Sequence, residues 1–223
     1  MILGVLVAIL MAGRASAMSQ EMIERLRSEE ISVPFPEVVA KWNTRAPGEV
    51  KGTGNIRARV VDGVKIVYYK PVIWGTVEAD FEDFKAKVNE TLNDERGWTR
   101  LNMRFVEVSE GYDVKVILAE PKTLNISGCS PELSCTTWNN EVIINDVRWR
   151  EGTEASRAAG MGQRDYQHMV VNHEMGHWLG HYKHIESCPN GGLAPIMLQQ
   201  STGMRGCEGF NAWPLDSELW TDK

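Results

Sequence analysis

The sequence has no apolar run of the roughly 20 residues that a membrane-spanning helix needs, because the run Ile2–Ala12 has only eleven residues. It also lacks a surplus of basic residues: 24 Lys and Arg stand against 30 Asp and Glu, and the net charge is −6. This charge argues against nucleic acid or an anionic membrane as the main partner. The sequence shows no internal repeat, and 43% of its 223 residues are hydrophobic. One globular domain, with or without an appendage, is therefore expected.

The apolar run at the start of the chain has no Lys or Arg before it, although signal peptides normally carry basic residues there. Its length nevertheless fits the core of a signal peptide, and residues 15–17 (Ala-Ser-Ala) fit a cleavage site. We therefore expect residues 1–17 to be a signal peptide or an N-terminal anchor to the membrane or envelope, with a buried element as the alternative. The protein would then be secreted or held at the cell envelope. Residues 18–55 are expected to form a helical extension and a linker.

Cysteine is scarce, and the absence of any C-x-x-C pair disfavours a cysteine-based zinc site. The four cysteines are an even number in a chain that is expected to be exported, and they allow three pairings. Their order along the chain favours Cys129–Cys135 and Cys188–Cys207. The second bond would close a loop of about twenty residues and stabilise the fold by roughly 3 kcal/mol. Free buried thiols in a cytosolic protein are the alternative.

The strongest indication of a functional site is the H-E-x-x-H motif that begins at His173. In a helix His173 and His177 lie on one face, so both imidazoles can bind one zinc ion. Glu174 lies next to that face and is free to act as general base toward a water that zinc makes acidic. Apolar residues flank the histidines, and Asp165 is expected to open the helix. The alternative is a core helix whose histidines are hydrogen-bonded and bind no metal.

A catalytic zinc site needs a third protein ligand and one open position. The helix can stop at Gly180, since Gly tolerates positive φ, and a later His can then return to the metal. His184 lies four residues past this turn and is the expected third ligand, while His181 directly follows the turn and is the alternative. If both bound the ion, the site would be closed and inert. His168, five residues before His173, is expected at the surface.

This stretch resembles the signature of the metzincin zinc proteases, H-E-x-x-H-x-x-G-x-x-H, over its first eight positions, His173 to Gly180. At the eleventh position the chain has Lys183, and His184 comes one residue later. Residues 194–197 (Ala-Pro-Ile-Met) look like the Met-turn of that family, which places Met197 beneath the metal. Over roughly residues 56–213 the chain also resembles a bacterial secreted family called domain of unknown function 3152, through His173–Met197, Gln199-Gln200-Ser201, Cys207 and Trp213-Pro214.

The metzincin resemblance implies an α+β fold for residues 56–223. It comprises a twisted mixed β-sheet, a backing helix, an active-site helix and a small irregular C-terminal subdomain with the Met-turn. The residue patterns predict a hairpin, a helix, three strands and the zinc helix, over residues 56–70, 76–92, 102–108, 112–119, 137–147 and from 165. By the same resemblance, the strand over residues 138–145 would be the sheet edge beside the cleft, where an extended peptide could add.

Together these features predict a secreted or surface-anchored zinc metalloendopeptidase that is monomeric, uses Zn²⁺ and acts on peptides or proteins. Zinc-activated water would attack the peptide carbonyl, and Glu174 would pass its proton to the leaving amine. Met197 would support the histidines. Residues 199–201 either line the cleft or form a solvated loop, and Trp138 and Trp213 either border the substrate groove or serve in packing. The alternative function is a catalytically inert, zinc-stabilised module that binds peptide or cell-wall material.

Overall fold

The structure is a computed structural model that describes residues 59–61, 63–188 and 190–221. The expected signal or anchor segment, residues 1–17, and the expected extension, residues 18–55, lie outside the described residues. All described residues fall within one compact unit, Lys41–Lys223. Among the helices of this part, none has both the length and the apolar character that crossing a membrane requires.

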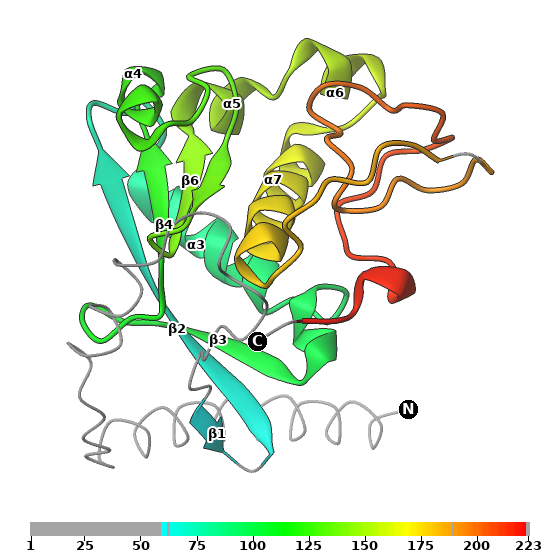
Figure 1. Ribbon diagram of the computed structural model, residues 1–223. Helices are drawn as coiled ribbons and strands as arrows, with labels where there is room; N and C mark the ends of the chain where they lie inside the picture. The colour runs from blue at the N-terminus through cyan, green and yellow to red at the C-terminus, as the bar shows by residue number, and fades with distance from the viewer. Residues whose placement is uncertain (1–58, 62, 189, 222–223) are drawn as a thin grey trace, which may run out of the picture. The chain divides into compact units, whose positions relative to one another are not determined.

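A six-stranded sheet forms the framework of the described chain (Figure 1). Its strand order is β1-β2-β4-β6-β5, and β3 pairs with β2 off this path. The contacts β2–β3, β2–β4 and β4–β6 are parallel, whereas β1–β2 and β5–β6 are antiparallel. The mixed sheet that the sequence predicts is therefore present. The strands are β1 (Arg59–Val61), β2 (Val64–Trp74), β3 (Met103–Glu107), β4 (Val114–Ala119), β5 (Cys135–Thr137) and β6 (Glu141–Asn145).

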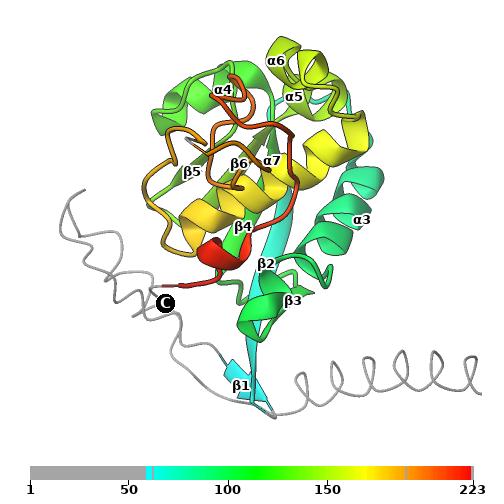
Figure 2. The ribbon, with the colours of Figure 1, turned by 90° about the vertical axis from the view of Figure 1, so that its right-hand side faces the viewer.

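Two helices cover one face of the sheet, α3 (Phe81–Leu92) and α7 (Gln163–Trp178) (Figures 1 and 2). Between them and the sheet lies the main core, to which β4 contributes every second residue: Val114, Val116 and Leu118. The alternate residues Ile117 and Ala119 face the other side, where Leu124 of α4 (Pro121–Leu124) and the Cys129–Cys135 disulfide pack on them. The short helix η2 (Asn125–Ser127) follows α4. Because both faces are covered, the central strands are nearly continuous apolar runs.

The backing helix begins later than its apolar spacing predicts. It starts at Phe81 rather than near Thr76, and the side chain of Asp80 caps it by accepting a hydrogen bond from the backbone N–H of Asp83. The reason lies elsewhere in the chain. The buried carboxylate of Asp146 accepts hydrogen bonds from the N–H groups of residues 78 and 79, which holds the preceding segment outside the helix.

Two further differences from the sequence prediction lie on either side of β6. The edge of the sheet is β5 and not the strand over residues 138–145, because a tight turn with Asn140 at φ 57° folds residues 135–137 back onto β6. After β6, in the stretch before the helix predicted from residue 165, the chain forms two short helices that were not predicted, α5 (Asp146–Glu151) and α6 (Glu154–Ala158). Asn145 and Thr153 cap them with their side chains.

Beyond α7 the described chain forms turns and one short helix, η3 (Asp216–Glu218), in agreement with the irregular C-terminal part that was expected. The remaining short helix is η1 (Trp98–Leu101). The disulfides are Cys129–Cys135 and Cys188–Cys207, the pairing that the order of the cysteines favours. The second disulfide closes a loop that carries Met197, which is buried.

Candidate metal centre

Helix α7 carries the first two histidines and is buried on nearly all sides. Every residue from Tyr166 to Gly176 is buried, because the helix lies between the sheet and the C-terminal turns. At the end of this helix Gly180 adopts φ +118°, a conformation that side-chain-bearing residues rarely adopt. The backbone N–H of His181 then bonds to the carbonyl of Gly176, and the chain turns back toward the helix. This turn is what brings His184 to the first two histidines.

Three histidines converge at the turn: His173, His177 and His184. One ligand nitrogen from each lies within 4.8 Å of the others, and the Nε2 atoms of His177 and His184 are 3.1 Å apart. A tetrahedral zinc site with Zn–N bonds of about 2.1 Å separates two nitrogens by about 3.4 Å, so this spacing suits a metal ion. His181 is not part of the group. Its ring Nε2 bonds to the carbonyl oxygen of Trp220 at 3.0 Å.

The hydrogen bonds of His173 and His177 engage Nδ1 of each ring and leave Nε2 available to bind a metal ion. Nδ1 of His173 lies 2.7 Å from the carbonyl oxygen of Ile196, and Nδ1 of His177 lies 2.6 Å from that of His181. A carbonyl only accepts, so each Nδ1 carries the proton and each Nε2 presents a lone pair. Burial lowers the pKa of His173 to about 3 and that of His177 to about 4. Both rings are therefore neutral at pH 7, which is the form that binds metal.

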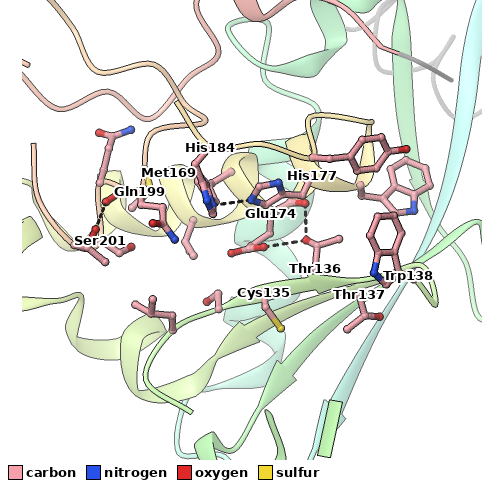
Figure 3. A pocket seen from close by; sticks show the side chains of 18 of the residues that line it. Cys135, Thr136, Thr137, Trp138, Met169, Glu174, His177, His184, Gln199 and Ser201 are labelled. Carbon is pink, nitrogen blue, oxygen red and sulfur yellow. Dashed lines mark hydrogen bonds between the residues drawn. The ribbon is translucent and has the colours of Figure 1, made fainter. Parts of the chain in front are cut away.

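The carboxyl group of Glu174 lies beside the histidines and is buried. The hydroxyl of Thr136 on β5 is 2.7 Å from the backbone oxygen of Glu174 and 2.9 Å from its Oε2 (Figure 3). A hydroxyl has a single hydrogen, so both contacts are fully satisfied only when the carboxyl is protonated and donates one of them. In agreement, desolvation raises the pKa of Glu174 to about 8. In the metal-free protein the carboxyl is therefore mostly protonated at pH 7.

A cavity of about 350 Å³ opens onto these residues. Trp138 lies at one end and Ser201 at the other, with His177, His184 and Glu174 between them (Figure 3). Trp138 and residues 199–201, whose position the sequence left open, are therefore part of the wall. Among the described residues that line it, Glu174 is the one carboxylate and there is no Lys or Arg. The walls are otherwise neutral, partly apolar and partly hydroxyl or amide.

Some residues of the site were not recognisable in the sequence. Thr136 lies on β5 next to Cys135, and no sequence pattern relates it to Glu174, 38 residues later. Tyr182, whose ring lies 5.6 Å from that of Trp138, follows the turn and has no motif of its own. The prediction that His168 lies at the surface is wrong. His168 is buried, and its Nδ1 lies 2.8 Å from the hydroxyl of Thr91. It is not one of the three converging histidines.

Met197 lies directly beneath the helix that carries the histidines. A Cβ atom added to Gly176 would lie 2.5 Å from the Sδ atom of Met197 and 3.0 Å from Cζ2 of Trp98. Both side chains are buried, so neither can move without displacing its neighbours. Gly176 therefore allows the helix to approach Met197 closely.

Substituting Ala for Gly176 is expected to lower the free energy of unfolding by about 1–3 kcal/mol, the usual cost of overpacking a core. In an open helix the same change would stabilise by about 1 kcal/mol, so the sign itself is diagnostic. Chemical denaturation of the metal-free protein measures it. In a Met197→Ala background, where space is vacated, the cost should shrink. Equal or higher stability of Gly176→Ala alone would show that the contact is not tight.

Comparison with known proteins gives one match. No curated protein and no solved structure matches the chain. A family model with the description "Protein of unknown function (DUF3152)" matches residues 40–219, a range that holds all three histidines, Glu174, both disulfides and Glu218. This is the family that the sequence resembles around His173–Met197. The chain belongs to this family, DUF3152.

Proposed function

We propose that the protein is an extracellular zinc-dependent peptidase with a metzincin-like arrangement of its active site. The observation that carries this proposal is the convergence of three histidine nitrogens beside the buried carboxyl of Glu174 in a cleft. The residues from His173 to Gly180 follow the metzincin signature. Zinc bound there would polarise a substrate carbonyl and make a water acidic enough to lose its proton near neutral pH.

The composition of the cluster supports catalysis over a purely structural metal site. Within the part of the chain that the structure describes, no fourth His, Cys, Asp or Glu joins His173, His177 and His184. Structural zinc sites are usually closed by four protein ligands, whereas catalytic sites keep one position for water or substrate. A buried carboxyl beside the histidines has no evident use in a closed site. The positive charge of a bound metal would favour its ionised form, which can accept a proton from water and donate it to the leaving amine.

The shape of the cleft supports an extended peptide as substrate. Strand β5 is the edge of the sheet and forms one wall through Cys135, Thr136 and Thr137. Edge strands can bind a further strand through backbone hydrogen bonds. A substrate paired with β5 would pass its backbone over Glu174, because Thr136 bonds to that residue. The neutral walls favour uncharged side chains next to the cleaved bond.

The disulfides support a place of action outside the cell. Two disulfides fit an extracellular protein, since such bonds persist in oxidising compartments. We propose secretion or attachment at the envelope, through the segment predicted over residues 1–17. The substrate would then be a peptide or protein outside the cell membrane, and the protein would act as a monomer.

Removal of metal tests the proposal. After dialysis against a chelator the protein should not cleave casein or a mixed peptide library, and one equivalent of Zn²⁺ should restore cleavage. Mass spectrometry of the products and metal analysis provide the two measurements. One zinc per chain without any cleavage would favour the inert binding module. Cleavage that persists in the metal-free protein would contradict a metal-dependent peptidase.

A further inference from the structure

A buried carboxylate in the last described turn holds the segment beneath the histidines. Glu218 in η3 is only 2% exposed. Its Oε2 accepts hydrogen bonds from the N–H groups of Ile196 and Leu215 at 2.8 and 2.9 Å. Its Oε1 accepts one from the N–H of Met197 at 2.8 Å. Burying a carboxylate is costly unless its oxygens are hydrogen-bonded, so these three contacts fix where the side chain and the Ile196–Met197 backbone lie.

One of these contacts leads directly to a metal-binding histidine. The N–H of Met197 and the carbonyl of Ile196 belong to the same planar peptide unit. Glu218 accepts a hydrogen bond from the N–H of this peptide unit. The carbonyl oxygen of the same unit, that of Ile196, accepts one from Nδ1 of His173 at 2.7 Å. The orientation of the His173 ring is therefore set by a peptide plane that Glu218 holds. A charged acceptor also polarises the peptide, which strengthens the bond at its other end.

The same C-terminal segment, Leu215–Thr221, also reaches the second histidine. Nδ1 of His177 bonds to the carbonyl oxygen of His181 at 2.6 Å. The ring of His181 is held by the carbonyl oxygen of Trp220 at 3.0 Å and packs on the Trp220 ring, with centroids 4.0 Å apart. The hydroxyl of Thr221 donates to the carbonyl oxygen of Leu179 at 2.8 Å, which ties the segment to the end of α7.

We propose that Glu218 and Trp220 are positioning residues of the metal centre, each orienting one helix histidine through the backbone carbonyl that its Nδ1 contacts. Glu218 acts on His173 through Ile196, and Trp220 acts on His177 through His181. His181 is thus a support for the site and not a ligand. This inference rests on the metal-binding part of the proposed function, but not on peptide cleavage.

The main test is Glu218→Gln. The substitution keeps the size of the side chain but replaces one acceptor oxygen by an NH₂ group that must face backbone N–H donors. Glu218 acts on His173 through one peptide unit, and the Ile196 carbonyl that contacts His173 stays in place. We therefore expect Zn²⁺ to bind up to about 10-fold more weakly, the lower end of the range for losing a ligand's own hydrogen-bond partner. The matched control is Asp216→Asn in the same short helix, where the carboxylate is 92% exposed and pairs with Arg100 at the surface. Its affinity for Zn²⁺ should not change.

Trp220→Ala provides a second test, because Trp220 is half exposed and its loss is less damaging to the fold. The variant removes the ring that packs on His181 but keeps the backbone carbonyl that His181 Nε2 contacts. We therefore expect Zn²⁺ binding to weaken by no more than about 10-fold, the lower end of the range for losing a ligand's hydrogen-bond partner, measured by competition with a chromophoric chelator. The visible spectrum of the Co²⁺-loaded protein supplies a readout of ligand geometry, which a general loss of stability would not change. Both variants should alter this spectrum, and Asp216→Asn should not.

The outcomes separate this inference from the proposed peptidase. Folded Glu218→Gln and Trp220→Ala proteins with unchanged Zn²⁺ affinity and Co²⁺ spectrum would overturn it, even if the wild-type protein cleaves peptides. If Glu218→Gln fails to fold, the affinity and spectrum of Trp220→Ala decide. Weaker Zn²⁺ binding in the variants would support the inference even if no peptidase activity is found. A wild-type protein that binds no Zn²⁺ would overturn both proposals.

Discussion

Replacing Glu174 by Gln is expected to lower kcat for peptide cleavage by about 10²–10⁴-fold, the range usually contributed by general acid–base catalysis. Zinc should stay bound, because the three ligands are histidines and Gln keeps the size of the side chain. The amide cannot accept the proton of the attacking water or pass it to the leaving amine. Loss of turnover with retention of metal is thus the expected signature of this variant.

The measurement pairs steady-state kinetics on a peptide substrate with the zinc content of each purified protein. Glu186→Gln is the matched control, because Glu186 is exposed just beyond His184 and should leave kcat unchanged. Thr136→Val should give a smaller loss than Glu174→Gln, since it removes only the hydroxyl that orients the carboxyl. Normal cleavage by Glu174→Gln would show that another group moves the proton.

The same variant should change the stability of the metal-free protein in a pH-dependent way. The pKa of Glu174 rises from 4.5 to about 8 on folding because of burial. At pH values between about 4.5 and 8 the folded state keeps a proton on Glu174 that the unfolded state has lost. The stabilising contribution of this carboxyl is therefore fully present below pH about 4.5 and is lost as the pH rises through about 8. Glu174→Gln lacks this term, and its stability relative to wild type should increase from pH 5 to pH 8.

Denaturant unfolding of both metal-free proteins across this range gives the comparison. The lowered pKa values of His173 and His177 act in the opposite direction, because their contribution is lost as pH falls below 6.5. Both histidines are present in both proteins, so the difference between the two curves reports Glu174. A difference that does not vary with pH would mean that the carboxyl titrates normally in the folded state. Active sites commonly carry such groups at the expense of stability.

Helix α7 could be predicted from the sequence because its information is local. A spacing of four residues puts His173 and His177 on one face whatever surrounds the helix. Strands β4 and β6 could also be predicted from the sequence, because strands that are covered on both faces are short runs of mostly apolar residues. The edge strand β5 was not predicted, because Cys135, Thr136 and Thr137 are short and polar. It is a strand only through its antiparallel pairing with β6.

The supporting residues could not be predicted, because they act across long stretches of chain. Thr136 contacts a residue 38 positions away, and Glu218 contacts the N–H groups of Ile196 and Met197, 22 and 21 positions away. No periodic pattern carries such pairs. For the same reason the choice between His181 and His184 stayed open. It depends on the path that the chain takes after Gly180, which a single φ value of +118° sets.

His184→Ala is expected to weaken Zn²⁺ binding by at least about 100-fold, more than the roughly 10–100-fold cost of losing a ligand's hydrogen-bond partner. His184 supplies one of three ligand nitrogens, and its removal leaves the two helix histidines alone. At a fixed excess of zinc, a 100-fold loss of affinity removes up to about 2.7 kcal/mol of metal-linked stabilisation. Thermal unfolding with and without Zn²⁺ measures this loss together with the affinity.

His181→Ala should lower the stability of the metal-free protein more than its Zn²⁺ affinity, the opposite of His184→Ala. Comparing the two variants therefore identifies the third ligand. His181 is buried between Trp98 and Trp220, so its removal should destabilise the metal-free protein while Zn²⁺ affinity falls by no more than about 10-fold. His184 is exposed, so His184→Ala should barely affect metal-free stability. If His181→Ala lost the metal and His184→Ala kept it, the third ligand would be His181. The turn after Gly180 would then follow a different path once metal is bound.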